Sequence, residues 1–410
     1  MNTYYDILVV GGGAAGFFTA INAAEMNTTK RIGLLERGKD VLTKVKISGG
    51  GRCNVTHAQY DPRELSKNYP RGEKELLGPF HSFMTGDTVA WFENRGVPIK
   101  TEADGRMFPA SNSSQSIIDC FIAETERLSI DVLLHNSVKV ISKEGELWKV
   151  ETKDQVYETP VLVLATGSNP KIWKLIEHLG HTIVPPVPSL FTFNSKDVRI
   201  LDLPGVSTPA SVKVLNEKGK VELESEGPLL ITHWGMSGPA ILKLSAWGAR
   251  ILEPRDYRFT IIVNWLPELS EEDVLEALVA NKGEFSKQTV LKYAQFGLPK
   301  RLWRNMVMAV GIDANETWAE ITKKKLQNLA QQLTASYFEV DGKSTFKEEF
   351  VTAGGVDLKE VNFKTFESKK CPGLYFAGEV LNIDAITGGF NFQNAWTGAF
   401  MVAEAITKRG

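Results

Sequence analysis

Apolar runs separated by glycine clusters dominate the beginning of the chain. Residues 7–10 are all apolar and end at Gly11, which is typical of a buried parallel strand. The alanine-rich stretch 14–24 predicts a helix, and the apolar stretch 32–35 predicts a second strand that ends at Glu36. A strand, a glycine-rich turn, a helix and a strand in this order predict a Rossmann-like unit that binds a dinucleotide.

The turn has the glycine spacing of a dinucleotide-binding fingerprint. Gly11 permits the tight turn, Gly13 lets the backbone approach a pyrophosphate, and Gly16 lets the helix pack closely on the strand. The first helical amides, those of Ala14 and Ala15, would face the phosphates together with the positive end of the helix dipole. We therefore expect the pyrophosphate at this turn.

The second strand ends in an acidic residue. Its distance along the chain from the glycine-rich turn is about that of the residue that binds the ribose in dinucleotide-binding folds. Glu36 would accept hydrogen bonds from the ribose hydroxyls, with Arg37 beside it. A carboxylate at this position suits a free 2′-hydroxyl, so the fingerprint favours FAD or NAD over NADP.

The pattern then changes several times along the chain. Residues 113–128 predict an amphipathic helix with Ser113 or Ser114 as its cap. Short apolar runs predict an antiparallel meander, and a buried parallel strand follows that ends at Gly167. The meander strands are expected at 132–134, 138–141 and 147–150, and the buried strand at 161–167.

The middle of the chain predicts a second domain. Consecutive prolines at 185–188 fix an extended path that leaves the first domain. Short alternating segments from 191 to 263 then predict a small β-barrel or sandwich. Later segments predict helices beginning at Ser270 and at 299–310 and 317–333, returning strands at 336–340 and 345–351, a strand at 374–379, and a last helix that continues to Ala405.

These elements predict an α/β protein with a Rossmann-like FAD-binding domain of the two-dinucleotide-fold type, interrupted by a β-barrel domain that carries a helical insertion. The predicted boundaries are 1–188 and 353–410 for the FAD-binding domain, 189–265 and 335–352 for the barrel, and 266–334 for the helical insert. At 410 residues the chain is long enough for two or three domains.

The composition of the chain limits the classes of partner that we expect. The formal net charge of −2 gives no support for nucleic acid or an anionic membrane, so we expect a small-molecule substrate and no nucleic-acid or membrane partner. The well-separated cysteines Cys53, Cys120 and Cys371 form no metal motif or dithiol pair, so we predict no metal site and a cytoplasmic, reducing location. The sequence leaves the oligomeric state open.

A second glycine-rich loop at 44–57 concentrates unusual chemistry. Gly49, Gly50 and Gly51 would expose backbone amides, and polar side chains around them could donate to an anion or an electron-rich ring. The polar side chains are Lys46, Ser48, Arg52 and Asn54. Cys53 within this loop is interpreted as a small buried hydrophobic residue, with a redox thiol as the alternative.

The chain resembles the HI0933-like flavoproteins, also called YhiN- or BaiN-like. The resemblance rests on the motifs at 11–16, 48–54, 105–109, 232–240 and 378–393, which occur in this order over nearly the whole chain. It implies a nucleotide-binding flavoprotein that holds FAD and acts as an oxidoreductase, with a flavin at the junction of its domains.

The resemblance also implies further site residues. The strand that ends at Ala165, Thr166 and Gly167 would return to the FAD sheet, and the adenine would lie near Glu36 and Val138. The last strand and helix would contact the ribityl chain, the pyrophosphate and the flavin pyrimidine ring through Gly378, Glu379, Gly388, Gly389, Phe390 and Asn391. All residues of the glycine-rich loop named above, Cys53 included, are candidates for flavin contacts.

The chemistry of the reaction is less constrained by the sequence. Lys46, Arg52, Asn54 and His233 are the candidate catalytic residues, of which the first three could polarise a carbonyl. We expect an FAD-dependent reductase of an enone or a similar carbonyl compound, with NAD(P)H as a possible transient electron donor because a second dinucleotide fingerprint is missing. The alternatives are a non-catalytic flavin-binding redox sensor or docking protein and a flavin amine oxidase; tRNA modification finds no support in the charge balance.

Overall fold

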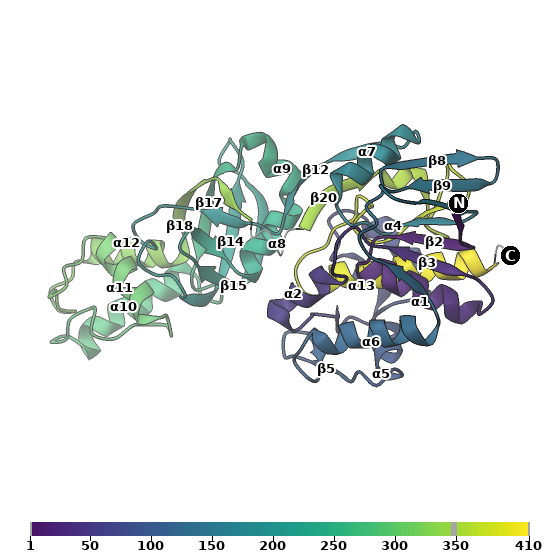
Figure 1. The fold of residues 1–410 in the computed structure, drawn as a ribbon. Coiled ribbons are helices and arrows are strands. Elements are labelled where there is room, and N and C mark those ends of the chain that lie inside the picture. Colours follow the sequence, from purple (N-terminus) through teal and green to yellow (C-terminus); the bar gives the residue numbers. More distant parts are fainter. Residues whose placement is uncertain (1, 346–350, 409–410) are drawn as a thin grey trace. The chain divides into compact units, whose positions relative to one another are not determined.

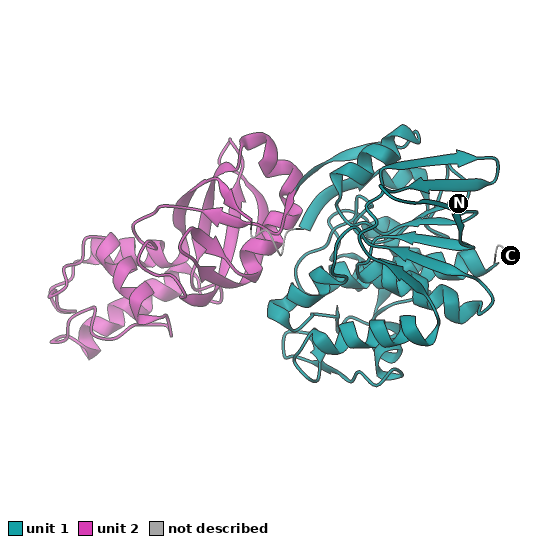
Figure 2. Ribbon diagram, viewed as in Figure 1, with its two compact units in different colours: residues 1–187, 347–410 teal, residues 188–346 magenta. Residues whose placement is uncertain are grey.

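The computed structural model describes residues 2–345 and 351–408. The chain forms two compact units, which Figure 2 shows in different colours. Unit 1 consists of Met1–Val187 and Lys347–Gly410, and unit 2 consists of Pro188–Phe346. Both ends of the chain therefore build unit 1, and unit 2 is inserted between them.

A seven-stranded sheet forms the centre of unit 1 (Figure 1). Its central strands are parallel and fully buried, because their residues are apolar or glycine. These strands confirm the strands predicted at 7–10, 32–36, 161–167 and 374–379. The spatial order is β21 (Val361–Asn362), β22 (Glu367–Ser368), β23 (Leu374–Phe376), β11 (Leu162–Leu164), β2 (Ile7–Val10), β3 (Ile32–Leu35) and β7 (Asp131–Leu133).

Helices from both ends of the chain pack against each other in unit 1. Helix α1 (Ala14–Met26) contacts α13 (Phe390–Lys408) and α6 (Gln115–Arg127), the helix predicted at 113–128. The ring of Phe18 in α1 lies 5.2 Å from the ring of Trp396 in α13, measured between centroids. The first and the last helix therefore share one aromatic core.

One strand of the predicted meander lies elsewhere. The four-stranded sheet contains β1 (Thr3–Tyr4), β10, β9 and β8, whereas β7 pairs in parallel with β3 at the edge of the main sheet. The prediction that 132–134 belongs to the meander is wrong, because a short apolar strand has no periodicity that separates parallel from antiparallel pairing. The predicted strands 138–141 and 147–150 correspond to β8 (Val140–Glu144) and β9 (Leu147–Glu151), whereas β10 (Val156–Thr159) was not predicted.

The remaining elements of unit 1 are short. A three-stranded sheet has the order β4, β6, β5, and β12 pairs with β20. The predicted strand 345–351 falls mostly on residues 346–350, which lie outside the described residues. The bounds are α2 (Thr43–Gly51), β4 (Thr56–His57), α3 (Pro62–Ser66), α4 (Glu73–Phe80), α5 (Thr85–Glu93), β5 (Ile99–Thr101), β6 (Arg106–Pro109), α7 (Pro170–His178), β12 (Ile183–Ser189), β20 (Val351–Val356) and the 3₁₀ turn η2 (Leu358–Glu360).

Unit 2 contains one curled antiparallel sheet. Its outermost strands β18 and β19 are separated along the chain only by Gly342, whose carbonyl accepts a hydrogen bond from Asn194 of β13. In the described part of the chain, no β-ladder joins these two edge strands, so the prediction of a closed barrel is wrong. The sheet stays open because β19 has only two residues with which to pair. The order is β18 (Ser336–Asp341), β17 (Arg258–Asn264), β14 (Ser207–Leu215), β15 (Val221–Ile231), β16 (Gly235–Ser237), β13 (Thr192–Asn194) and β19 (Lys343–Ser344).

The helices of unit 2 follow the predicted pattern with two differences. Helix α10 (Glu271–Glu284) begins with a capping box between Ser270 and Asp273, as the sequence predicts. Helix α12 (Lys323–Thr334) begins six residues later than predicted, because Thr322 caps it while Thr317 binds Glu320 in a separate turn. The predicted helix 299–310 is α11 (Lys300–Ala309); α8 (Pro239–Trp247), α9 (Ala249–Leu252) and the 3₁₀ turn η1 (Glu253–Arg255) were not predicted.

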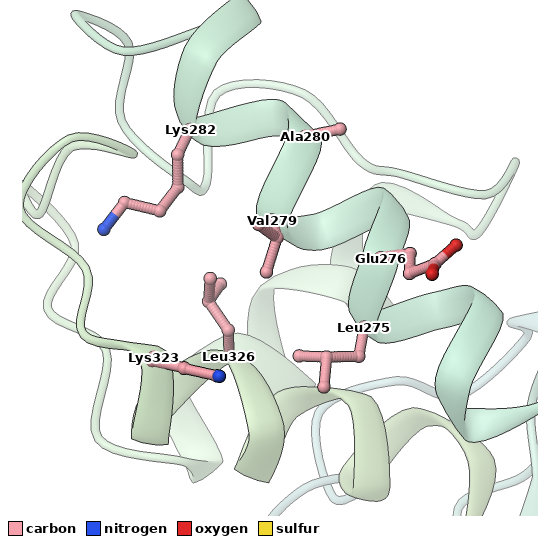
Figure 3. Close-up of a pocket in the computed structure, with 7 residues that line it drawn as sticks. All are labelled: Leu275, Glu276, Val279, Ala280, Lys282, Lys323 and Leu326. Carbon is pink, nitrogen blue, oxygen red and sulfur yellow. The ribbon is translucent and has the colours of Figure 1, made fainter.

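A shallow groove runs between α10 and α12 (Figure 3). It has a volume of about 540 Å³, an apolar floor and two lysines at its rim. The Nζ of Lys282 donates to the carbonyl of Ile321, so this ammonium belongs to the helix packing. The lining residues are Leu275, Glu276, Val279, Ala280, Lys282, Lys323 and Leu326.

A buried polar network joins the segment after α7 to the edge of the main sheet. The imidazole of His181 contacts a carboxylate oxygen of Glu360 at 2.9 Å through Nδ1 and the Ser368 hydroxyl at 2.8 Å through Nε2. The Ser368 oxygen also accepts the amides of Lys370 and Cys371, so it has no free lone pair for a further donor. The network is therefore satisfied when His181 is neutral and donates from Nδ1.

Charge on His181 would disturb this network. Burial lowers the pKa of His181 below its usual range, despite the neighbouring carboxylate. Burial acts to raise the pKa of Glu360, but hydrogen bonds from Lys370, Thr182 and His181 outweigh it and bring the pKa to about 2. The folded protein thus binds fewer protons at these two sites than the unfolded chain when the medium becomes acidic.

We predict that this network makes the fold sensitive to mild acid. A histidine whose pKa is lowered by folding contributes stability above its unfolded pKa of about 6.5 and loses it as the pH falls below that value. His181→Gln should therefore show a smaller decrease in the denaturation midpoint than the wild type between about pH 7.5 and about pH 5.5. The exposed His178 gives the control: His178→Gln should retain the pH dependence of the wild type, and equal slopes for all three proteins would contradict the prediction.

Candidate functional site

The glycine-rich turn after β2 brings backbone segments into direct contact. The amide of Gly11 donates to the carbonyl of Leu35 at 2.8 Å, and a Cβ at Gly11 would lie 2.4 Å from the carbonyl oxygen of Ala165. A Cβ at Gly16 would lie 1.9 Å from the carbonyl oxygen of Gly11, so only glycine lets α1 start this close to the strand. In contrast, a Cβ at Gly13 would meet no atom within 4 Å. This open side of the turn is where the fingerprint requires close access for a pyrophosphate.

The N-terminus of α1 offers its amides to this open side. Gly13 is the N-cap residue, and no side chain caps the helix. The first amides of the helix, which belong to Ala14 and Ala15, therefore keep the partial positive charge that favours an anion. The geometry fits a diphosphate at this position.

Glu36 holds the edge of the turn. One carboxylate oxygen accepts the amide of Gly12 at 2.9 Å, and the other accepts the amide of Gly38 at 2.7 Å. Each oxygen retains a lone pair that could accept a hydroxyl. The backbone carbonyl of Glu36 accepts the amide of Asn136 at 2.8 Å, which places the segment leading to Val138 beside Glu36. The predicted ribose and adenine residues therefore lie together, whereas the neighbouring Arg37 is exposed.

The second glycine-rich loop begins inside α2. The helical conformation ends at Ser48, and the next three residues, Gly49, Gly50 and Gly51, all have positive φ. The amide of Cys53 donates to the carbonyl of Ser48 at 3.0 Å and closes the loop. Cys53 is fully buried, and burial raises the pKa of its thiol to about 12, so the thiol is neutral and behaves as a buried hydrophobic group.

The guanidinium of Arg52 contacts two neighbouring side chains. It lies 3.9 Å from the centre of the Phe108 ring and pairs with Glu102 at 2.6 Å. These contacts anchor the glycine-rich loop to strand β6 and the turn before it. Arg52 therefore holds the loop, and its charge is shared with a carboxylate.

The N-terminus of α13 meets the same loop. A Cβ at Gly389 would lie 2.9 Å from Oδ1 of Asn54 and 2.5 Å from the carbonyl oxygen of Thr56. The ring of His57 stacks on Phe390 at 4.6 Å, and its Nδ1 lies 3.0 Å from the carbonyl oxygen of Gly388. The loop and the N-terminus of α13 thus lie against each other and form one wall. This wall leaves no room for a side chain at residue 389.

The helix itself is fixed by buried hydrogen bonds. Gln393 accepts the hydroxyls of Thr56 at 2.6 Å and Thr88 at 3.0 Å, and Trp396 donates to the carbonyl of Val55 at 2.9 Å. Asn391 uses its side chain to hold both the amide and the carbonyl of Ala385. Asn391 therefore shapes the loop before α13 with its polar atoms.

The carboxyl ends of β23 and β11 complete the site. A Cβ at Gly378 would lie 3.1 Å from Cβ of Ala15, so β23 ends beside the N-terminus of α1. Glu379 pairs with Lys44 of α2 at 2.6 Å, and its carboxylate lies 3.7 Å from the Cβ position of Gly167. Three segments that are far apart in the sequence thus meet where the fingerprint predicts the pyrophosphate.

Three of the segments that carry predicted site residues or motifs contain a buried oxygen atom that makes no hydrogen bond with the described residues. The first is Oδ1 of Asn54, which lies against α13. The others are Oγ1 of Thr166, a residue that follows β11, and Oδ1 of Asn382, a residue that precedes the loop before α13. Unsatisfied buried polar atoms are costly, and they are satisfied if a ligand with polar edges covers them. A flavin dinucleotide has such edges, so the donor and acceptor set fits FAD.

The structure separates the predicted site residues into three groups. The glycines, Glu36, Asn54, Ala165, Thr166, Gly167, Glu379 and Phe390 come together in unit 1 as described above. Lys46 is exposed, and its Nζ makes no hydrogen bond or ion pair with the described residues. His233 lies in unit 2, on the exposed turn between β15 and β16, and is not among the residues that unit 1 brings together.

Some residues that shape the site were not predicted. Lys44 pairs with Glu379, Gln393 joins α13 to Thr56, and Arg71 pairs with the fully buried Asp384. These partners are separated by hundreds of residues, so no local pattern identifies them. Lys44 stands in the glycine-rich loop at 44–57, and Asp384 and Gln393 stand in the motif at 378–393, so the sequence marks their segments as functional but not their partners.

We predict that Gly13→Ala separates ligand binding from folding. A Cβ at this position meets no protein atom, so the apoprotein should unfold at the wild-type temperature, while the methyl group obstructs the approach of the pyrophosphate. The affinity for FAD, measured by titrating the apoprotein and following flavin fluorescence, should fall by about tenfold or more. Gly86→Ala, in a helix and likewise without a close neighbour, is the matched control and should change neither quantity. Unchanged FAD affinity in Gly13→Ala would contradict the assignment.

The described residues contain no cluster of three or more His, Cys, Asp or Glu residues suited to hold a metal ion. Within 2–345 and 351–408, no helix combines the length and the apolar composition needed to span a membrane.

Comparisons with known proteins agree with this geometry. The ribosomal RNA dihydrouridine synthase of Haemophilus influenzae is 28% identical over 424 aligned residues, with 100% of both chains covered. The 3-dehydro-bile acid delta(4,6)-reductase of Clostridium scindens is 26% identical over 410 residues, with 98% of both chains covered. The solved structure of 3-ketosteroid delta1-dehydrogenase from Sterolibacterium denitrificans has a TM-score of 0.53 at 12% identity, with 100% of both chains covered, which indicates a shared fold.

The family model described as the HI0933-like protein Rossmann domain matches residues 5–405. This range contains the glycine turn, the loop at Ser48 and nearly all of α13. The fold class predicted from the sequence is thereby confirmed, with the correction to the barrel given above. The chain belongs to the HI0933-like family of Rossmann-fold, FAD-dependent oxidoreductases.

Proposed function

We propose that the protein is an FAD-dependent reductase of a carbon–carbon double bond conjugated with a carbonyl group, with NAD(P)H as the electron donor. The observation that carries the proposal is a shared chemistry among relatives matched over their full length. Dihydrouridine forms when the double bond of uracil next to a carbonyl is reduced. A 3-oxo steroid with a delta(4) double bond has the same conjugated arrangement. Both names thus describe reduction of one type of bond, which the enone reductase predicted from the sequence would also reduce.

The polar wall around Asn54 supports this proposal. FAD, when bound and reduced by the electron donor, would supply the hydride for such a reduction. The amides at the start of α13 would stabilise negative charge on the flavin, and the helix has no acidic residue in its first turn to oppose them. Asn54 would satisfy its buried Oδ1 against a donor on the ring edge.

Among the four candidate catalytic residues, Lys46 is the one we assign to the substrate carbonyl. Its ammonium makes no ion pair with the described residues, whereas Arg52 is paired with Glu102. A free ammonium can stabilise the negative charge that develops on the carbonyl oxygen when a hydride adds to the conjugated carbon. Arg52 would instead position the loop that carries Asn54.

The proposal predicts two separable half-reactions. Under anaerobic conditions, NADH or NADPH should bleach the flavin absorbance of the purified holoprotein. A uridine-containing RNA oligonucleotide or the steroid testosterone, a 3-oxo-4-ene, should then restore the absorbance and yield the dihydro product, which mass spectrometry identifies by its gain of two hydrogens. The near-neutral charge of the chain predicts a small-molecule substrate, and the oligonucleotide tests the alternative that the Haemophilus relative's name raises.

Other outcomes would contradict the proposal. A flavin that neither nucleotide reduces would argue for another donor, or for the redox sensor considered from the sequence. A flavin reduced by substrate amines would argue for an amine oxidase. Reoxidation by neither conjugated probe would remove the support for an enone reductase.

We also predict that Lys46→Gln slows substrate reduction. Loss of one donor to a developing oxyanion lowers kcat by about 10²-fold. The FAD content and the rate of flavin reduction by the nucleotide should be unchanged, because the exposed Lys46 side chain makes no hydrogen bond or ion pair with the described residues that hold the loop. The exposed Lys74 of α4 provides the control, and Lys74→Gln should behave as the wild type. A wild-type kcat in Lys46→Gln would show that another group polarises the carbonyl.

A further inference from the structure

An ion pair between Lys44 and Glu379 joins two distant parts of unit 1. Lys44 is the second residue of α2, and Glu379 lies three residues after the end of β23. The ammonium nitrogen lies 2.6 Å from Oε2 of the carboxylate, and the lysine side chain is 54% exposed. An exposed ion pair contributes little to folding stability. The surroundings of the pair therefore decide what it does.

The backbone that carries Lys44 starts at the glycine turn. The amide of Leu42 donates to the carbonyl of Gly12 at 2.8 Å, and a Cβ at Gly12 would lie 3.1 Å from Cγ1 of Val41. The amide of Lys46 then donates to the carbonyl of Leu42 at 3.0 Å and begins the hydrogen bonding of α2. The start of α2 is thus fixed directly against the glycine turn, and Lys44 lies in its first turn.

The carboxylate of Glu379 lies at the carboxyl ends of β23 and β11. Its Oε2 lies 3.7 Å from the Cβ position of Gly167, which follows β11. The preceding residue, Gly378, has a Cβ position 3.1 Å from Cβ of Ala15 in the first turn of α1. The side chain of Glu379 is 19% exposed, and its Oε1 makes no hydrogen bond with the described residues. A mostly buried carboxylate therefore stands beside the helix end to which the fingerprint assigns the diphosphate.

An unpaired carboxylate at this place would oppose the ligand. A diphosphate is negatively charged, and negative charges a few ångströms apart repel each other strongly where the protein excludes water. The carboxylate would also compete with the diphosphate for the positive N-terminus of α1. The ammonium of Lys44 offsets the charge of Glu379 and leaves Oε1 free to accept a hydroxyl group of a ligand.

We infer that Lys44 is a positioning residue of the FAD site. By pairing with Oε2 it neutralises Glu379 and fixes the direction of the carboxylate, so that the negative diphosphate of FAD can bind beside an acidic residue. Lys44 acts through Glu379 and is not itself a ligand of the phosphates. The inference rests on the FAD site in unit 1 and does not depend on the reaction proposed above.

The salt dependence of FAD affinity tests the inference. Serial dilution of the purified full-length holoprotein, followed through the fluorescence of released flavin, gives the dissociation constant of FAD. Lys44→Gln leaves Glu379 unpaired and should raise this constant by about tenfold at about 0.1 M salt. At about 1 M salt, which screens charges beyond about 3 Å, the difference from the wild type should fall to about twofold. Lys44→Arg keeps a cation that pairs with the carboxylate and should bind FAD as the wild type does.

Two further variants separate the charge on Glu379 from other effects. Glu379→Gln removes the charge that Lys44 offsets but keeps an oxygen that accepts a hydroxyl. The double variant Lys44→Gln/Glu379→Gln should therefore bind FAD within about twofold of the wild type. Lys408 is the matched control, because it pairs with Glu404 at 2.7 Å at the C-terminal end of α13, whose N-terminus lies at the site. Lys408→Gln should leave the dissociation constant unchanged.

Three results would overturn the inference. The first is a wild-type dissociation constant in Lys44→Gln, and the second is an equal loss of affinity in Lys408→Gln. The third is a double variant that binds FAD as weakly as Lys44→Gln, which would make Lys44 a direct ligand of the phosphates. The measurement needs neither a substrate nor an electron donor. Failure of this inference is therefore distinguished from failure of the proposed reduction, which is seen only with the conjugated probes.

Discussion

The contact between the backbone of Gly11 and that of Gly16 is the constraint on which unit 1 depends. With only 1.9 Å between the Gly11 carbonyl oxygen and the position of a Cβ at residue 16, any side chain there would displace α1 from the strand. The same turn approaches Ala165 at the end of β11 and donates to Leu35 at the end of β3. Three parallel strands and one helix are therefore aligned by a few backbone atoms, and the positive end of α1 is held at the edge of the sheet.

The second half of the site depends on α13, which comes from the other end of the chain. This helix is buried on most sides and uses polar side chains such as Gln393 to bind hydroxyls of the segment from β4 to α5. Such a network is stable only when every member is paired, and it fixes the helix along its axis. The N-terminus of α13 consequently lies against Asn54, so the loop that the sequence marks as chemically unusual and the last helix form one wall.

The sequence predicts the parts of this arrangement that depend on local patterns. The glycine spacing, the apolar runs of β2, β3 and β11, and the capping box at Ser270 each follow from residues a few positions apart. What it could not predict depends on partners distant in the chain. The ion pair of Arg52 with Glu102 and its contact with the Phe108 ring are examples of such partners. The parallel pairing of β7 and the open edge of the unit 2 sheet depend on tertiary contacts that short strands do not encode.

The electrostatics of the α13 end follow from one such distant pair. Asp384 is fully buried and lies beside Ala385, which Asn391 binds, so its negative charge would oppose the positive end of the helix. Arg71 binds both carboxylate oxygens of Asp384 and neutralises this charge. Loss of one partner of a buried ion pair typically costs about 3–5 kcal/mol, so the pair is fixed once unit 1 has folded. Because the carboxylate is neutralised within the protein, the amides at the start of α13 remain available for negative charge on a bound ring. That property is needed by a site that stabilises a reduced, anionic flavin.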